Sequence, residues 1–321
     1  MDPLISCLMV TRGGLYPASF AIECFRTQTY DNRELVIVCD EPGAAVAAYV
    51  AELADPKIRY VETGHARLGE LRNVSVAEAR GELVCQWDDD DLYHPNRLEY
   101  QLGNLVKSGT SAHFLGRWTI WWPKRRTLAL SSIRVWEGSM LARREAVGPY
   151  PAQSREEDAV MLAELMDKHR FIVTDSPDYY CYVVHGANTC DADHFEFMLE
   201  RASWVFSDYE AELARRAGRF PFRGYLDRLD RKAKGEPEVT PDYSGRMFGG
   251  ERLAIDGARF RGCRFNGTLL TYNGGEPPLF DSCHFHNIAF DFQGPAGHSL
   301  ALLRWLTDRG IIPEMRKSRS A

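Results

Sequence analysis

Short apolar runs alternate with amphipathic segments over the first hundred residues of the chain. Strand-length apolar runs occupy residues 4–10, 34–39, 58–61 and 83–87. Segments with helical patterning occupy residues 17–29, an alanine-rich stretch that ends near Leu53, residues 68–80, and a stretch from Pro95 to about Lys107. This alternation predicts an α/β fold, with a mostly parallel sheet covered by helices.

The residue composition changes between positions 112 and 145, where aromatic and β-branched residues predict strands and loops that close over a site. Four tryptophans fall in this region: Trp118, Trp121, Trp122 and Trp136. Each could stack on a sugar ring, but a core position is the favoured interpretation. A helix is expected at 155–168, with Ala159, Leu162, Leu165 and Met166 on its apolar face. Strands at 171–174 and 179–184 and helical segments at 194–216 complete a domain spanning residues 1–230.

The C-terminal part of the chain has its own organisation. Residues 231–246 are polar and rich in Pro and Gly, which predicts a linker. Residues 247–321 contain a 20-residue repeat, in which Phe260-x-x-Cys263-x-Phe265 recurs as Phe280-x-x-Cys283-x-Phe285. Short strands at a fixed period predict two rungs of a small β-solenoid, with an amphipathic helix at 299–309 as its cap. The expected role is a scaffold or a homo-oligomer contact.

Four consecutive aspartates, Asp88 to Asp91, follow the apolar run at 83–87 directly. Adjacent carboxylates repel one another and resist burial unless water or a cation compensates. In open α/β sheets, ligands bind beyond the carboxyl ends of the strands. The pattern therefore favours a site for Mn²⁺ or Mg²⁺ with a phosphate ligand over the alternative, a solvated acidic turn.

Composition narrows the class of protein. The chain has 321 residues with a formal net charge of −6 and no long basic stripe, which gives no sign of a nucleic-acid partner. None of its eight cysteines forms a C-x-x-C pair, which argues against a structural zinc site and favours reduced thiols. There is no signal-peptide pattern and no apolar stretch of membrane-spanning length. A cytoplasmic protein is expected, with contact at the membrane periphery left open.

Four segments together give the first 225 residues a resemblance to the family 2-like glycosyltransferases of the GT-A fold. They are Pro3 to Arg12, Gln28-Thr29-Tyr30 with Glu34 to Asp40, Leu68 to Asn73 with Ala79 to Glu82, and Asp88 to Asp91 with Pro95. The last segment looks like the family's D-x-D motif. Two departures leave the base and sugar open: Gly13-Gly14 replaces the usual Asn after the first strand, and Asp40-Glu41-Pro42 replaces an acidic pair.

The resemblance implies a site and a reaction. The donor would be a nucleotide-diphosphate sugar, with a UDP-sugar favoured, and the acceptor an unknown glycan, lipid or small molecule. The resemblance places nucleotide-sugar contacts at Thr11, Arg12, Asp40, Arg72, Asn73, Asp88 and Asp89 and metal ligands at Asp90, Asp88 and His185. Glu157-Asp158 resembles the family's Glu-Asp motif, which makes Asp158 the expected general base of an inverting transfer and Glu157 an acceptor contact.

Two other functions stay open at this point. A nucleotidyltransferase would share the sheet and the metal chemistry, and Thr11-Arg12-Gly13-Gly14 is a faint hint of its phosphate loop. A non-catalytic nucleotide-sugar-binding protein would need the acidic cluster but no base, so the presence of both acidic motifs argues against it.

Overall fold

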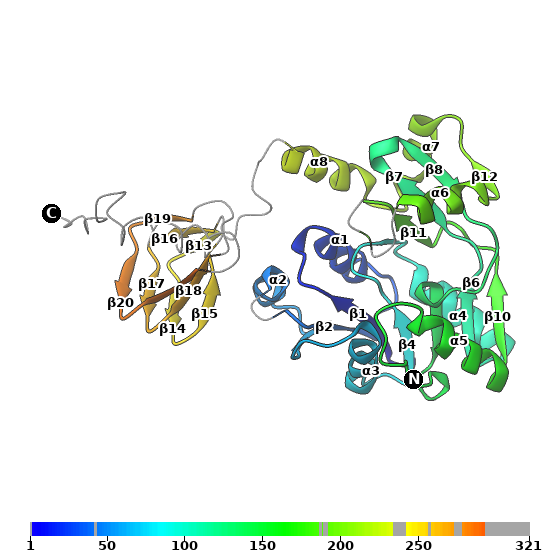
Figure 1. Cartoon of the computed structure of the whole chain (residues 1–321), viewed down its shortest axis with the longest axis horizontal. Helices are drawn as coiled ribbons and strands as arrows, with labels where there is room; N and C mark the ends of the chain where they lie inside the picture. Colours follow the sequence, from blue (N-terminus) through cyan, green and yellow to red (C-terminus); the bar gives the residue numbers. More distant parts are fainter. Residues whose placement is uncertain are drawn as a thin grey trace, which may run out of the picture. The chain divides into compact units, whose positions relative to one another are not determined.

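The computed structural model describes residues 2–41, 44–185, 188, 192–233, 242–255, 258–272 and 278–292. The chain divides into two compact units, residues 1–230 and residues 231–321, both drawn in Figure 1. Within the described residues, no helix is both long enough and apolar enough to span a membrane.

A seven-stranded sheet forms the centre of the first unit. Its order is β10 (Phe171–Thr174), β6 (Ala112–Leu115), β9 (Met140–Arg143), β4 (Leu83–Gln86), β1 (Ile5–Thr11), β2 (Arg33–Cys39) and β3 (Ile58–Glu62). Only β9 runs antiparallel to its neighbours. The helices between the strands are α1 (Leu15–Arg26), α2 (Ala45–Leu53), α3 (Leu68–Glu78), α4 (Arg97–Ser108) and α5 (Glu157–Lys168). The predicted α/β class with a mostly parallel sheet is confirmed.

Side chains of β1 alternate between two apolar clusters because successive residues of a strand point to opposite faces. Cys7 and Met9 belong to the main core, which includes α1, whereas Leu8 packs with Leu71 of α3. On α5, the buried apolar side chains are Met161, Leu162 and Leu165, whereas Ala159 and Met166 are exposed. The prediction of the apolar face was therefore correct for Leu162 and Leu165 but wrong for Ala159 and Met166.

A second sheet has the order β12 (Trp204–Val205), β8 (Thr127–Leu130), β7 (Thr119–Trp122), β11 (Tyr180–Val183) and β5 (Leu92–Tyr93). Helices α6 (Ala192–Glu200), α7 (Tyr209–Arg216) and α8 (Phe222–Ala233) complete the unit, so β12 interrupts the helical stretch expected at 194–216. Trp118, Trp121 and Trp122 are buried core residues, as favoured, whereas Trp136 is half-buried. The four aspartates join the end of β4 to β5, so they lie where the two sheets meet.

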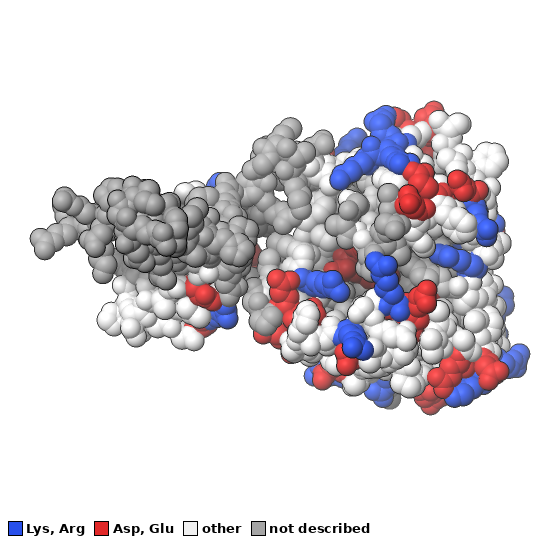
Figure 2. Space-filling view, in the orientation of Figure 1, with Lys and Arg blue, Asp and Glu red and all other residues white. Residues whose placement is uncertain are grey.

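Charged side chains of both signs are interspersed over the visible face of the first unit (Figure 2). Several form exposed ion pairs, including Arg126 with Glu210 and Arg125 with Glu196. Exposed pairs of this kind contribute only about 0–1 kcal/mol each. The apolar clusters therefore carry most of the unit's stability.

The second unit consists of short parallel strands. They form three sheets, ordered β13 (Asp242–Ser244), β16 (Arg259–Arg261), β19 (Leu279–Asp281); β14 (Met247–Gly249), β17 (Arg264–Asn266), β20 (His284–His286); and β15 (Arg252–Ala254), β18 (Leu269–Tyr272), β21 (Ala289–Phe292). Phe260 stacks on Phe280, and Phe265 on Phe285, with ring centroids 4.9 Å apart in both pairs. The parallel strands and ring stacks are consistent with the predicted solenoid-like module.

The structure corrects the extent of this module. A first turn, with Tyr243 stacked 5.0 Å from Phe260, lies partly within the predicted linker 231–246, and α8 extends to Ala233 at the linker's other end. Three turns are therefore described instead of two. Cys263 and Cys283 are free thiols that donate to backbone oxygens of the preceding turn. The predicted cap at 299–309 lies outside the described residues.

Candidate active site

Asp91 fixes the acidic segment to the second sheet. Its carboxylate accepts hydrogen bonds from the backbone N–H of Val183, at 2.8 Å, and from the hydroxyl of Tyr180. The Tyr93 hydroxyl donates to the backbone oxygen of Asp88 at 2.9 Å. Burial and the charge of Asp90 raise the pKa of Asp91 well above its usual range. Asp91 is thus an internal residue that shapes the loop.

Asp90 points toward the segment that follows β11. Its Oδ2 lies 3.0 Å from Nε2 of His185 and 3.2 Å from Nδ2 of Asn188. The structure therefore brings together two of the three expected metal ligands, although 95 positions separate them. Asn188 also donates to the Val183 backbone oxygen at 2.9 Å, which holds the end of β11 beside the acidic segment.

Asp88 and Asp89 are partly buried carboxylates. Burial raises the pKa of Asp88, and the neighbouring Asp90 charge also raises it, whereas the nearby Arg72 guanidinium lowers it. Burial and then the charge of Asp90 raise the pKa of Asp89 to about 8, against a hydrogen bond with Thr11 that lowers it. The segment therefore holds more negative charge than its protein surroundings compensate.

Arg72 of α3 connects this segment to the first turn of α5. Its guanidinium nitrogens lie 3.8 Å from Asp88, 3.1 Å from Glu157 and 3.2 Å from Glu137. Only 12% of the Arg72 side chain is exposed, and the Tyr150 ring lies 5.9 Å from it. Arg72 therefore sits between the two acidic motifs that the sequence analysis singled out.

The two carboxylates at the start of α5 have different surroundings. Glu157 is 3% exposed and faces Arg72, so it lies inside the protein instead of on a surface that an acceptor could reach directly. Asp158 is half-buried, and its Oδ1 accepts the backbone N–H of Ala159 at 2.9 Å. The carboxylate of Asp158 interacts electrostatically with Glu137, Tyr150 and Arg134. Asp158 is therefore the more accessible of the two carboxylates.

The remaining predicted nucleotide contacts lie at the ends of strands or on α3. Thr11 is buried and accepts the Gly13 N–H at 3.1 Å, whereas Arg12 is exposed. Asp40, after β2, is 5% exposed and lies 3.4 Å from the exposed imidazole of His65. Asn73 differs from these residues, because its amide donates to and accepts from the backbone of Tyr150, at 2.8 Å each. These two bonds give Asn73 a structural task in the loop before α5.

Sequence reasoning missed Glu137, Tyr150, Tyr180 and Asn188. Glu137 lies in a short 3-10 turn, Glu137–Ser139, and is 1% exposed. Burial raises the pKa of Glu137 to about 8, against the lowering effect of Arg72. No local motif marks this residue. The available signal was a single acidic residue in a region whose other charged residues are all basic, from Arg117 to Arg144.

Side chains pack so closely against the backbone of residue 138, in the same turn, that only glycine fits there. A Cβ there would lie 2.8 Å from Oδ2 of Asp88 and 2.6 Å from the Trp136 ring. Gly138→Ala is expected to destabilise the protein by about 1–3 kcal/mol and to weaken ligand binding at Asp88. Thermal unfolding checks this. Gly103→Ala is the control, since nothing lies within 4 Å of a Cβ on that α4 residue. Equal melting temperatures for both variants would contradict the prediction.

The carboxylate oxygens of the acidic segment are the ligands that a hard divalent cation such as Mn²⁺ or Mg²⁺ prefers. The raised pKa values of Asp88, Asp89 and Asp91 mark charge that a cation would neutralise. In the described part of the chain, no three His, Cys, Asp or Glu side chains converge as a protein-only metal site. Mg²⁺ commonly takes one or two carboxylates and completes its shell with water and substrate phosphates, so the residues present suit that mode.

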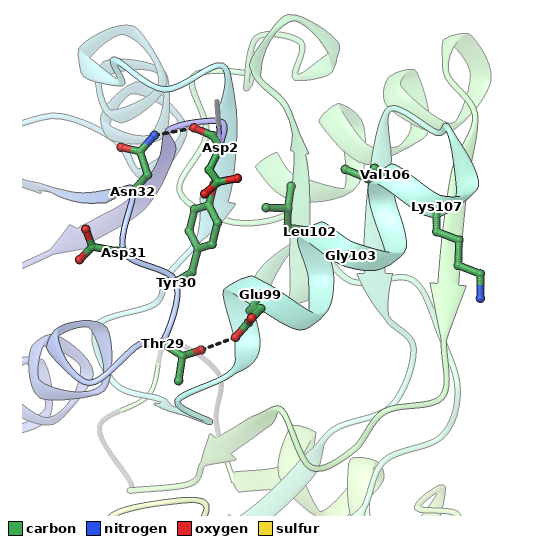
Figure 3. A pocket seen from close by; sticks show the side chains of 10 residues that line it. All are labelled: Asp2, Thr29, Tyr30, Asp31, Asn32, Glu99, Leu102, Gly103, Val106 and Lys107. Carbon is green, nitrogen blue, oxygen red and sulfur yellow. Dashed lines mark hydrogen bonds between the residues drawn. The ribbon is translucent and has the colours of Figure 1, made fainter.

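A surface pocket of about 690 Å³ lies elsewhere on the unit (Figure 3). Asp2 and Asn32 line it at the start of β1 and β2, and Glu99 and Val106 line it from α4. Because β1 and β2 are parallel, this pocket is at the opposite end of those strands from Thr11 and Asp40. It shares no residue with the acidic site.

Residues 19–146 of the chain match the protein family described as glycosyl transferase family 2. This part of the chain is therefore similar to that family. The match contains the strands β2 to β4, α3 with Arg72, the four aspartates and Glu137. The predicted family resemblance is confirmed. Asp158 and His185 lie beyond the matched residues.

Curated proteins similar to this chain include a putative colanic acid biosynthesis glycosyl transferase, WcaA, from Escherichia coli K12. It is 35% identical over 114 residues, which are 35% of this chain and 41% of the relative. An Escherichia coli UDP-Glc:α-D-GlcNAc-diphosphoundecaprenol β-1,3-glucosyltransferase, WfgD, is 28% identical over 34% of this chain and 44% of its own length. The chain thus spans less than half the length of these relatives.

Solved structures with a similar arrangement include Staphylococcus aureus TarS 1–349 in complex with UDP-GlcNAc. The TM-score is 0.49 at 14% identity, over 67% of this chain and 71% of that one. The mannosyltransferase PcManGT from Pyrobaculum calidifontis, in complex with GDP-Man and Mn²⁺, gives 0.47 at 16% identity, over 67% and 65%.

Proposed function

We propose that this protein transfers a sugar from a nucleotide-diphosphate sugar to an acceptor hydroxyl, with a divalent metal and with inversion at the anomeric carbon. A UDP-sugar is the favoured donor. The observation that carries the proposal is the position of Arg72, which contacts both Asp88 and Glu157. Arg72 thus joins the acidic segment to the start of α5, and a donor and an acceptor could meet beside it.

The donor half of the site lies at the carboxyl ends of β1, β2 and β4. Asp88, Asp90 and His185 would hold Mn²⁺ or Mg²⁺, which would supply positive charge to the diphosphate leaving group. Thr11, Arg12, Asp40 and Asp89 would contact the nucleotide sugar, and Asp88 would also reach the ribose or the water shell of the metal. Arg72 adds a fixed positive charge close to Asp88. These assignments account for charged and polar side chains that serve no apolar core.

Asp158 is proposed as the general base that accepts the proton of the attacking hydroxyl. It is half-buried, so an acceptor hydroxyl can reach its carboxylate. Glu157 stays paired with Arg72 and would hold the first turn of α5 in place. Attack on the face of the sugar opposite the leaving group would give inversion.

The acceptor is proposed to be a glycan or a lipid-linked sugar, handled in the cytoplasm or at the membrane periphery. The printed names of WcaA and WfgD support this, since one refers to colanic acid biosynthesis and the other to a diphosphoundecaprenol-linked acceptor. The second unit would serve as a scaffold or as a homo-oligomer contact.

Calorimetric titration of UDP into the full chain, with and without Mn²⁺, tests the donor site. Binding that strengthens at least about tenfold with Mn²⁺ is expected, because the metal would relieve the repulsion among the aspartates. GDP and dTDP are the next nucleotides to titrate. Absence of binding for all three would contradict the proposed function, and a response independent of metal would contradict the metal assignment.

A further inference from the structure

The three nitrogens of the Arg72 guanidinium each face a different carboxylate. Nε lies 3.1 Å from Glu157, Nη1 lies 3.2 Å from Glu137 and Nη2 lies 3.8 Å from Asp88. Two of these partners belong to the acidic segment and the α5 turn that the proposed function uses. Glu137 belongs to neither, and no motif or family comparison assigns it a task.

Glu137 is held more firmly than a surface ion-pair partner would be. It is 1% exposed, and its Oε1 accepts hydrogen bonds from both Arg72 and the Tyr150 hydroxyl, the latter at 2.7 Å. The backbone of Tyr150 is in turn fixed by Asn73, the neighbour of Arg72 on α3. Glu137 is thus anchored from two sides before it meets Arg72.

We propose that Glu137 is a positioning residue that fixes the Arg72 guanidinium in the orientation from which it contacts Asp88 and Glu157 together. This inference rests on the proposed function. An arginine side chain has several rotatable bonds, but its guanidinium is a rigid planar fork, so one firmly held partner sets the direction of the remaining nitrogens. Without Glu137, Arg72 can settle on either Asp88 or Glu157 and leave the other unpaired.

A double-mutant cycle tests whether Glu137 acts through Arg72. UDP is titrated by calorimetry in the presence of Mn²⁺ into the full-length protein and into Glu137→Ala, Arg72→Ala and the double variant. Each single substitution is expected to lower affinity at least about tenfold, because each leaves buried charges without a partner. The double variant is expected to bind no more weakly than Arg72→Ala alone, since residues that act as a unit are not additive.

Three further variants separate positioning from general structural damage. Glu137→Gln keeps an acceptor oxygen for Arg72 and Tyr150, so it is expected to lose only about threefold in affinity. Tyr150→Phe removes one of the two hydrogen bonds to Glu137 Oε1. If Glu137→Ala fails to fold, Tyr150→Phe replaces it in the double-mutant cycle. Glu145→Ala is the matched control, because Glu145 is exposed in the next 3-10 turn, and its affinity should equal the wild type.

The possible failures are distinguishable. If the wild type binds UDP but the losses of Glu137→Ala and Arg72→Ala add fully, Glu137 does not work through Arg72 and this inference is overturned. Unchanged affinity in Glu137→Ala or, should that variant not fold, in Tyr150→Phe would also overturn it. If the wild type binds none of UDP, GDP and dTDP, the proposed function itself fails, and this inference fails with it.

Discussion

Asp158→Asn is expected to lower the rate of sugar transfer by about 10²–10⁴-fold, the range that a positioned general base contributes. The asparagine side-chain oxygen can still accept the Ala159 backbone N–H that Asp158 accepts, so the first turn of α5 should remain intact. Affinity for UDP with Mn²⁺ should stay within about twofold, because Asp158 touches none of the proposed donor contacts. Turnover is measured with UDP-sugars and candidate glycan acceptors, and UDP affinity by calorimetry.

Asp167→Asn is the matched control, since Asp167 is exposed near the other end of the same helix. It removes the same charge from α5 without touching the site, and its transfer rate should equal that of the wild type. An Asp158→Asn enzyme that transfers sugar at the wild-type rate would show that the base is elsewhere. Loss of UDP binding together with activity would instead assign Asp158 to the donor.

Local sequence pattern was enough to predict the first half of the sheet. The apolar runs at 4–10, 34–39 and 83–87 are short and bounded by polar residues, and each is a buried strand within one residue of its predicted ends. The acidic segment was visible for the same reason. Four carboxylates after a buried strand stand out from any pattern that serves a core.

Features set by long-range contacts could not be read in this way. Glu137 gains its significance from Arg72, 65 positions earlier, and from Tyr150 after it. The two-residue strand β12 exists because Trp204 and Val205 pair with β8, and nothing local distinguishes them from the helices on either side. Burial on α5 likewise depends on which neighbours cover it, which moved the apolar face to include Met161.

Repeat spacing explains the missed turn of the second unit. Phe260 pairs with Phe280, 20 positions on, and this period was visible. Tyr243 pairs with Phe260, only 17 positions on, and the first turn has no cysteine at the matching corner. A shorter connection between strands preserves the ring stack in space while removing the fixed period from the sequence.

Asp90→Ala is expected to abolish the Mn²⁺-dependent part of UDP binding while leaving the fold intact. Asp90 is the carboxylate that faces His185, so its loss removes the proposed metal pair at its centre. Its charge also raises the pKa of Asp88, Asp89 and Asp91, so removing it relieves repulsion inside the segment. The gain should offset the lost bonds to His185 and Asn188, which predicts a melting temperature within a few degrees of the wild type.

Asp90→Asn separates charge from shape, because an amide can still contact His185 and Asn188 but is a much weaker ligand for a hard cation. It should lose the response to Mn²⁺ as Asp90→Ala does. Asp193→Ala, an exposed aspartate of α6, is the control and should respond to Mn²⁺ as the wild type does. Undiminished metal-dependent binding in Asp90→Asn would place the cation elsewhere in the segment. A large fall in melting temperature for both Asp90 variants would instead make this carboxylate a structural partner of His185, because relief of repulsion would then be too small to matter.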